Sequence, residues 1–426
     1  MSLQFKYEKT CLINKSELSK ELYKLDKVIN LMNEVTKTKY QTDFAFLNLL
    51  NETRFLDESL VLARYFKSAS LLVVIGIGGS NLGAMAAYQA IAKNKIKILF
   101  ADTVDSDNIQ KIINEMTKCL KEEKEVVINC ITKSGTTLET ISNFAILLEI
   151  LKKLRKDYKK YVVVTTNKNS KLWDIAKKEN FHILEIPEKV GGRYSVLSNI
   201  GLFPLAMAGV DIKKLIEGAK AIKIHCLNKN VLRNPAALSA LIMFLHYRRG
   251  KSIVNTFLFN NELEYFGKWY RQLLAESIGK EKDSLGRLVN AGMTPIVSIG
   301  TTDLHSMMQL YLAGPNDKIT TFINVKQTNK LNIHRLKEFG SLLNGLNGRD
   351  LDYLMNIILN GVKKTYNERL LPYMEISLAN KSEYCIGQLL QLKMMEVVYL
   401  AYLLNVNPFD QPNIEEYKEK VRKLLK

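Results

Sequence analysis

Cysteine is scarce in this sequence, and its distribution excludes two common kinds of site. The chain of 426 residues has five cysteines, an odd number, and no two of them form a CxxC pair. Disulfide frameworks and zinc sites both require closely spaced cysteines in recognisable sets. The sequence therefore argues against a disulfide-stapled fold and against a cysteine-ligated metal, and it favours a reducing compartment.

Long apolar runs are also missing. None approaches the roughly 20 residues that a membrane-spanning helix requires, and the opening residues MSLQFKYEKTCLINKSEL contain no apolar signal segment. With 8 prolines, 47% hydrophobic and 24% charged residues, the composition is typical of a globular protein. We therefore expect a cytoplasmic protein with no membrane association and, at this length, two domains.

Acidic residues are outnumbered by basic ones. The chain has 43 Asp and Glu against 61 Lys and Arg, a net charge of +18. Such a balance is compatible with a nucleic acid, an anionic surface or a small anionic substrate. The basic runs, such as EEYKEKVRKLLK, mix acids at helical spacing and lack the aromatic interleaving of a base-stacking surface. We therefore favour solvated helix faces and expect no nucleic-acid partner, while an anionic substrate stays compatible.

Short β-branched runs alternate with amphipathic stretches from about residue 70 onward. The runs at 70–77, 125–132, 161–166 and 182–186 are apolar on both sides, as parallel strands buried on two faces are. The segments between them, such as LETISNFAILLEILKKL, carry helical spacing. This alternation predicts an α/β fold with a mainly parallel sheet flanked by helices in three layers.

A second, similar set of strands comes after a mainly helical stretch. Strand-like runs recur at 252–259, 294–300 and 318–325. We therefore predict two domains of similar build. Their expected bounds, with helical segments at the two ends of the chain, are 50–205 and 206–405, joined by 1–49 and 406–426.

A glycine-rich turn comes directly after the first predicted strand. In VIGIGGSNLGA, the third glycine of a dinucleotide fingerprint is replaced by Asn81, which weakens the nucleotide interpretation. A turn that opens a helix still offers free backbone N–H groups to a phosphate, and Ser80 adds a hydroxyl. A tight packing turn would explain the glycines but not Ser80, so both interpretations stay open.

The turn after the second buried strand is rich in hydroxyl groups. In VINCITKSGTTLET, Thr132, Ser134, Thr136 and Thr137 crowd the entry to a predicted helix, and Thr136 and Glu139 have the spacing of a capping box. One hydroxyl suffices for a cap. Because this turn and the glycine turn end neighbouring parallel strands, the extra hydroxyls favour an anion site at that edge of the sheet.

Three further side chains are candidates for chemistry. Arg193 comes after two glycines in KVGGRYSVLSNIG and suits an oxyanion, although a surface arginine without a role is common. Glu276 lies on a helix with Trp269 and Gln272 at three- and four-residue spacing, and desolvation there would suit it to carrying a proton. His305 is expected in the first turn of a helix after a strand, where the dipole favours neutral imidazole. The other four histidines lack such a setting.

Six segments in order give the chain a family resemblance. They are IGIGGSNLGA, KSGTTLET, GGRYSVLS, QLLAESIGK, GTTDLHSMMQL and NPFDQPNIEEYK. Over about residues 70–420 the chain resembles the glucose-6-phosphate isomerase (phosphoglucose isomerase) family in its compact bacterial form. The resemblance implies an isomerase of glycolysis and gluconeogenesis that interconverts glucose 6-phosphate and fructose 6-phosphate.

The resemblance also implies roles for individual residues. Glu276 would move the proton between C1 and C2 through a cis-enediolate, His305 and Lys418 would open the sugar ring, and Arg193 would hold the enediolate charge. The residues implied to bind the substrate are Gly79, Ser80, Thr132, Lys133, Ser134, Thr136, Thr137 and Gln272. The family pattern further implies a homodimer in which His305 reaches the neighbouring subunit's site, and neither a metal nor a cofactor.

Two positions depart from the family pattern. Thr132 replaces a more usual Ser and keeps the hydroxyl. Asn413 replaces a usual Gly, and we expect it to tolerate a left-handed backbone there. Two alternatives remain: a phosphosugar-binding regulator, which would need neither Glu276 nor His305, and an isomerase that also accepts mannose 6-phosphate, which would share every residue named.

Overall fold

The chain forms two compact units in a computed structural model that describes residues 2–93 and 96–425. The first unit comprises residues 30–221 and 268–273, and the second comprises 1–29, 222–267 and 274–426. Helix α11 (Glu264–Ile278) contributes residues to both. No helix in the described part of the chain combines the length and apolar character needed to cross a membrane.

The first unit contains a five-stranded sheet whose strands are all parallel. Along the sheet the order is β3-β2-β4-β5-β6. The bounds are β2 Ala69–Ile75, β3 Lys97–Ala101, β4 Glu125–Thr132, β5 Val162–Thr166 and β6 His182–Glu185. The prediction of runs buried on both sides is confirmed for β2, β4 and β5, which are buried almost throughout. It is wrong for β6, an edge strand whose residues are mostly half-buried. Strand β3 was missed because an edge strand is only partly buried and lacks a continuous apolar run.

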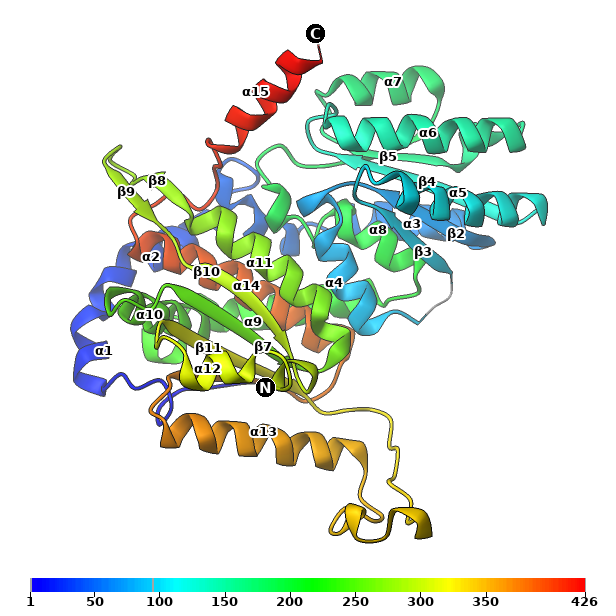
Figure 1. The fold of residues 1–426 in the computed structure, drawn as a ribbon. Coiled ribbons are helices and arrows are strands. Elements are labelled where there is room, and N and C mark those ends of the chain that lie inside the picture. Colours follow the sequence, from blue (N-terminus) through cyan, green and yellow to red (C-terminus); the bar gives the residue numbers. More distant parts are fainter. Residues whose placement is uncertain (1, 94–95, 426) are drawn as a thin grey trace. The chain divides into compact units, whose positions relative to one another are not determined.

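Helices cover the sheet of the first unit (Figure 1). Helices α5 and α6 pack against each other and against β4, while α8 packs against α3, α4 and β2. This arrangement confirms the predicted layering of helices on a mainly parallel sheet. The bounds are α3 Arg54–Tyr65, α4 Leu82–Ile91, α5 Ser106–Lys121, α6 Leu138–Leu154, α7 Lys171–Glu179 and α8 Asn199–Met207; α2, Asp26–Val35, and α9, Ile212–Cys226, have residues in both units.

The second unit contains another five-stranded sheet, in the order β1-β12-β11-β7-β10. All its strands are parallel except β1, which pairs antiparallel with β12. Strand β1 lies in the segment expected to be helical, so that expectation is wrong for residues 3–6. A four-residue edge strand is set by its tertiary pairing and gives no periodic signal of its own. The bounds are β1 Leu3–Lys6, β7 Ile253–Phe259, β10 Thr294–Ile299, β11 Lys318–Val325 and β12 Tyr373–Leu378.

A small hairpin and several helices complete the second unit. The hairpin pairs β8 (Lys280–Lys282) with β9 (Leu288–Ala291). Helix α14 is buried along most of its length and packs against α10, which explains why apolar residues lie on all of its sides. Lys393 and Glu396, also buried, form an ion pair with each other. The helix bounds are α1 Lys15–Glu21, α10 Pro235–Arg248, α12 Met308–Ala313, α13 Leu351–Glu368, α14 Glu383–Leu403 and α15 Ile414–Leu424.

Four strands of each sheet follow the same order. In the first, the chain runs from β2 to its neighbour β3 and then to β4 on the other side of β2; in the second, it runs from β7 to β10 and then to β11 on the other side of β7. In each sheet the chain therefore adds a strand first on one side of β2 or β7 and then on the other, so that the order of the strands reverses there. Open α/β sheets bind ligands at the carboxyl ends of strands at such a reversal, which directs attention to the loops after β2 and β4 and after β7 and β11. The loop after β10 lies on the other side of β7.

Candidate active site

The loop after β2 is a glycine turn pressed against a second turn of the first unit. A Cβ atom on Gly79 would lie 2.2 Å from the carbonyl carbon of Gly192 and 2.6 Å from the backbone nitrogen of Arg193. Neither contact could be relieved by moving a side chain. Gly79 is thus required for the backbone of its loop to touch the backbone of the 191–194 turn.

Ser195 joins these two turns by hydrogen bonds. Its hydroxyl lies 2.6 Å from the carbonyl oxygen of Gly192 and 3.3 Å from that of Gly79. Arg193, which lies between Gly192 and Ser195 in the sequence, is only 3% exposed. The alternative that it is a surface arginine without a role is therefore wrong. Sequence reasoning missed Ser195, although it lies within the GGRYS segment.

Gln272 of α11 reaches the same glycine loop. A Cβ atom on Gly78, whose φ is +60°, would lie 2.9 Å from Nε2 of the Gln272 side chain. Ser80, at the end of this turn, is half-buried. The first unit therefore brings together Gly79, Ser80, Arg193 and Gln272, four of the predicted site residues.

The hydroxyl turn after β4 does not form the expected capping box. Helix α6 begins at Leu138 with Thr137 at its N-cap, and no side chain caps it there. The hydroxyls of Thr132 and Thr137 lie 2.9 Å apart and bond each other instead. These hydroxyls are therefore not used to satisfy the backbone of α6.

Ser134 organises the exposed part of the same turn. Its Oγ accepts hydrogen bonds from the backbone N–H and the hydroxyl of Thr136, both at 3.2 Å. A hydroxyl that accepts two bonds can still donate its own proton. Ser134 and Thr136 are exposed, Thr137 is half-buried and Thr132 is buried. The hydroxyl donors that a ligand can reach are therefore concentrated at residues 134–137.

A second layer of contacts supports this turn. Gly135 has a φ of +70°, and a Cβ atom there would lie 2.8 Å from Cβ of Ser170. Ser170 caps α7 by accepting from the N–H of Trp173 and also bonds Thr166, whose hydroxyl donates to the carbonyl oxygen of Thr132. Burial lowers the pKa of Lys133 in this turn from its usual value.

The strand register places the two loops side by side. Strands β2 and β4 are adjacent, with Ile75 opposite Cys130, and both loops leave from the carboxyl ends of these strands. The order in which strands are added to the sheet reverses at this position. Backbone N–H groups and hydroxyls converging there have the donors that an anion requires.

Glu276 lies one helical turn after Gln272 on α11, within the part that belongs to the second unit. It is half-buried. The predicted apolar stripe of this helix is confirmed, since Leu263, Phe266, Tyr270 and Leu273 are each at most 1% exposed. The carbonyl oxygen of Glu276 accepts a hydrogen bond of 2.8 Å from the ammonium of Lys280.

His305 lies outside the helix in which it was expected. A one-turn 3₁₀ helix, Thr302–Leu304, precedes it, and α12 starts only at Met308. The expectation that His305 lies in the first turn of a helix is therefore wrong. The turn is fixed by Asp303, whose carboxylate accepts from the N–H of Ile299 at 2.7 Å and from the hydroxyl of Ser306 at 2.6 Å. His305 itself is exposed.

Lys418 lies on α15 and forms an ion pair of 2.8 Å with Glu415 of the same helix. Asn413 precedes this helix with a φ of −68°, which is right-handed. The expectation that Asn413 would need to tolerate a left-handed backbone is therefore wrong. Its side chain instead donates a hydrogen bond of 3.0 Å to the carboxylate of Glu281.

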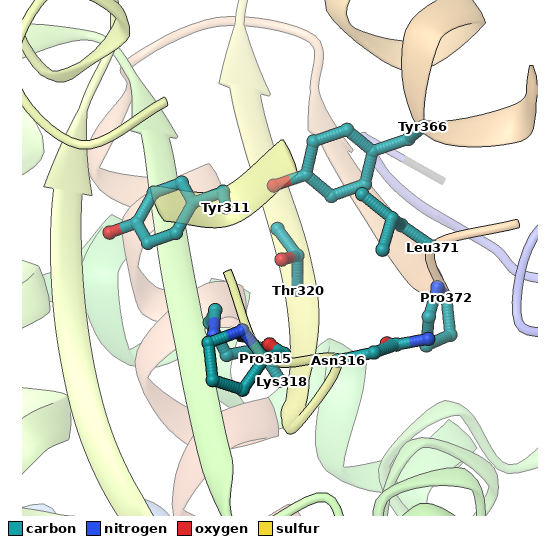
Figure 2. A pocket seen from close by; sticks show the side chains of 8 residues that line it. All are labelled: Tyr311, Pro315, Asn316, Lys318, Thr320, Tyr366, Leu371 and Pro372. Atoms are coloured by element: carbon teal, nitrogen blue, oxygen red, sulfur yellow. Dashed lines mark hydrogen bonds between the residues drawn. The ribbon is translucent and has the colours of Figure 1, made fainter. Parts of the chain in front are cut away.

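The second unit contains a small pocket (Figure 2). Its volume of about 10 Å³ has room for about one water molecule. It adjoins the start of β11, whereas His305 lies beyond the carboxyl end of β10. Its lining residues are Tyr311, Pro315, Asn316, Lys318, Thr320, Tyr366, Leu371 and Pro372.

Metal ligands do not gather at these loops. Within residues 2–93 and 96–425, no three His, Cys, Asp or Glu side chains are grouped so that they would hold a metal ion. In the first unit, the loops after β2 and β4 offer hydroxyls and backbone amides, which suit anion binding. In the second unit, the carboxylate of Glu276 and the imidazole of His305 are groups that can transfer protons.

Known proteins match this chain over most of its length. The family model described as phosphoglucose isomerase matches residues 61–426. A probable glucose-6-phosphate isomerase of Methanococcus maripaludis is 36% identical, covering 98% of this chain and 93% of that protein. A glucose-6-phosphate isomerase of Acholeplasma laidlawii is 33% identical, covering 96% and 97% respectively.

Solved structures share the fold. A hypothetical protein of Thermus thermophilus superposes with a TM-score of 0.87 at 26% identity, covering 99% of this chain and 100% of the other. A glucose-6-phosphate isomerase of Chlamydia trachomatis gives a TM-score of 0.85 at 21% identity, covering 100% and 88%. The extent of the family match and the identity to its members agree with the motifs, and the chain belongs to the phosphoglucose isomerase family.

Proposed function

We propose that this chain is an aldose–ketose isomerase that interconverts glucose 6-phosphate and fructose 6-phosphate, a step of glycolysis and gluconeogenesis. Family membership and the names of its relatives support the reaction. The observation that carries the proposal is the pair of adjacent loops after β2 and β4, which present glycine N–H groups and uncommitted hydroxyl protons at the reversal of the sheet.

The phosphate of the substrate binds at these loops. A phosphate ester carries about −1.5 to −2 charges near neutral pH and accepts hydrogen bonds strongly. Ser134 accepts two bonds within its turn and keeps its own proton for a ligand. In the Thr132–Thr137 pair, one hydroxyl donates its proton to the other, and the proton of the accepting hydroxyl stays available for a ligand. Gly79, Ser80, Lys133 and Thr136 complete the proposed phosphate site.

Glu276 moves the proton between C1 and C2. Removal of a proton beside a carbonyl needs a positioned base and a partner for the developing oxyanion. The base takes the proton from one carbon and returns it to the other, so no oxidant or reductant is consumed. Arg193, buried beside the glycine loop, holds the negative charge of the cis-enediolate, and Gln272 contacts the sugar.

His305 and Lys418 open the sugar ring by moving protons at its oxygens. Support for Lys418 comes from its place on α15, where it is partly exposed and, within the described chain, forms its ion pair with a neighbour on the same helix. The ring of His305 is exposed at the end of a turn that Asp303 fixes. Both groups are thus accessible to a ligand.

The active form is a homodimer in which His305 serves the neighbouring subunit's site. Complementation tests this arrangement: Glu276→Gln and His305→Ala variants, each inactive alone, are unfolded, mixed and refolded together. Mixed dimers would contain one site with both residues intact, so activity should return to a substantial fraction of wild type. Mixtures that stay inactive although mixed dimers form would contradict the shared site.

The enzyme acts in the cytoplasm without a metal or organic cofactor. All five cysteines are buried and unpaired, which suits a reducing compartment. Fractionation of cells that produce the protein tests its location. Loss of activity after dialysis against a chelator, with recovery on adding a metal ion, would contradict the metal-independent mechanism.

A coupled assay tests the proposed reaction. Wild type is given fructose 6-phosphate, and formation of glucose 6-phosphate is measured without added metal. Glu276→Gln should lower kcat by about 10²–10⁴-fold, the usual contribution of a general base, with little change in KM. Glu368→Gln, an exposed carboxylate at the end of α13, is the matched control and should behave as wild type. Normal turnover by Glu276→Gln would rule out this base.

A further inference from the structure

The β8–β9 hairpin begins with a buried lysine that joins two segments far apart in sequence. Lys280 is 6% exposed. Its ammonium donates to the carbonyl oxygen of Glu276 at 2.8 Å and to that of Asp410 at 2.5 Å, and its distance to the Asp410 carboxylate is 3.0 Å. The three donors of one cation are thus directed at the end of α11 and at the segment that leads into α15.

The hairpin holds the same C-terminal segment at two further places. The backbone N–H and the hydroxyl of Ser284 both donate to the carbonyl oxygen of Asn405, at 2.8 and 3.0 Å. At the other end of the segment, the Asn413 amide donates to Glu281 at 3.0 Å. Residues 405–413 are therefore attached to the hairpin near their start, at Asp410 and at the residue before α15.

The loop of the hairpin is itself rigidly built. The buried side chain of Asp283 accepts from the backbone N–H groups of Leu285 and Arg287 and from the Arg287 guanidinium. The hydrogen bond from Arg287 holds the pKa of Asp283 below its usual range. A carboxylate satisfied in this way stays ionised and keeps the loop in one conformation at neutral pH.

Helix α15 lacks the packing that positions most helices. None of its residues, 414–424, is buried. Its ion pairs within the described chain join residues of the same helix: Lys418 and Arg422 with Glu415, and Lys420 with Glu416. Because no buried face anchors α15, the direction in which it carries Lys418 depends on the attachment of residues 405–413.

We propose that Lys280 is a positioning residue that couples Glu276 to Lys418. It fixes the end of α11, which carries the base, and through Asp410 it fixes the segment that aims α15. A cation at a helix C-terminus is a common stabilising device, but that role alone accounts for neither the Asp410 ion pair nor the parallel bond between Glu281 and Asn413. This inference rests on the proposed function, since it assigns Lys418 a part in the reaction.

The experiment compares Lys280→Met with Lys282→Met, a control on the same hairpin where the side chain is exposed. Hydrogen–deuterium exchange of residues 405–424 is measured without substrate, and kinetics are measured with fructose 6-phosphate. For Lys280→Met we expect exchange of this segment to rise roughly tenfold or more, and kcat to fall roughly tenfold, the equivalent of about 1.4 kcal/mol. The KM should stay within about twofold of wild type, because the phosphate loops are untouched.

Asp410→Asn provides a second variant if Lys280→Met does not fold. It keeps the carbonyl oxygen that accepts from Lys280 but removes the ion pair, so exchange and kcat should change in the same directions by a smaller factor. Lys280→Arg, which keeps the charge, should recover part of the lost kcat.

Unchanged exchange in residues 405–424 of folded Lys280→Met overturns the inference, and so does faster exchange with normal kcat. The proposed function fails separately, if wild type does not isomerise the sugar phosphate. In that case unchanged exchange still refutes the attachment of α15, and faster exchange limits Lys280 to a structural role and overturns its part in catalysis.

Discussion

The sheets of the two units share the order of four strands but carry different chemistry on their loops. In the first unit the loops after β2 and β4 are short turns of glycines and hydroxyls, backed by hydrogen bonds to Ser170 and Ser195. In the second unit the segments after β7 and β10 lead to a carboxylate and an imidazole, Glu276 and His305. One architecture thus supports an anion site in one copy and proton-transfer groups in the other.

The difference lies in the loops and not in the sheets. Strands β2, β4, β7 and β11 are all buried runs of similar length. The turn after β2 lies so close to its neighbour that only glycine fits at residue 79. The turn after β10 has a shape that depends on one carboxylate, Asp303. If the loops after β2 and β4 bind the phosphate and the groups of the second unit react, variants in these loops should raise KM and variants in the second unit should lower kcat.

Gly79→Ala is the strongest test of the binding side. Its Cβ would overlap the backbone of Gly192, so the two turns must separate. We expect a loss of about 3 kcal/mol or more in the free energy of unfolding, at the upper end of overpacking costs, and a large rise in KM. Urea denaturation and the coupled assay measure both. Gly361→Ala, on α13 with no atom near its Cβ position, is the control and should be neutral or stabilising. Equal behaviour of the two variants would contradict this account.

Acid should destabilise the second unit through His246. Burial lowers the pKa of His246 from 6.5 to about 4. Its Nε2 lies 2.7 Å from the carbonyl oxygen of Cys11, while Nδ1 is buried with no partner within the described chain. The folded state therefore excludes the charged form. The contribution of His246 to the free energy of unfolding is complete above pH 6.5, and it falls by about 3 kcal/mol as the pH drops toward 4.

The matched variants for this prediction are His246→Gln and His182→Gln. Burial also lowers the pKa of His182 in the first unit, but that side chain is half-buried. Urea midpoints at pH 7 and pH 4.5 should show that His246→Gln removes more of the acid sensitivity than His182→Gln. The same acid sensitivity in wild type and His246→Gln would show that this imidazole is not responsible.

Asp303→Ala tests the reacting side. Without the carboxylate, the N–H of Ile299 and the hydroxyl of Ser306 lose their acceptor, and the turn before His305 loosens. We expect kcat to fall roughly tenfold, about 1.4 kcal/mol, with KM nearly unchanged. Ser306→Ala removes one of the two bonds and should have a smaller effect. A rise in KM at constant kcat would mean that this turn contributes to substrate binding. It would contradict the assignment of binding to one unit and of proton transfer to the other.

Ser170→Ala should have the smallest effect. It removes the cap of α7 and the partner of Thr166 behind the hydroxyl turn. Loss of a serine cap costs about 1 kcal/mol of stability, and KM should rise slightly while kcat stays normal. Thermal denaturation and the coupled assay measure these changes. A fall in kcat with an unchanged KM would mean that the hydroxyl turn does more than bind.

The sequence determined the fold class and the candidate residues because both depend on local patterns. Continuous apolar runs indicate parallel strands that are buried on two faces, and glycine and hydroxyl residues after such runs can be read directly from the sequence. Strands β1, β3 and β12 were not predicted. The first two are short, partly exposed edge strands, and β12, which lies between β1 and β11, alternates buried and half-buried residues toward its end. Their identity is a property of the sheet and not of the segment.

Only the tertiary structure decided what the side chains do. The hydroxyls of Thr132 and Thr137 bond each other and not the end of α6, Arg193 is buried, and Lys280 links α11 to the segment before α15. Each of these depends on atoms brought together from separate parts of the chain. Sequence spacing fixes which residues share a helix face, but the competition among hydrogen-bond partners is settled only when all the acceptors are in place.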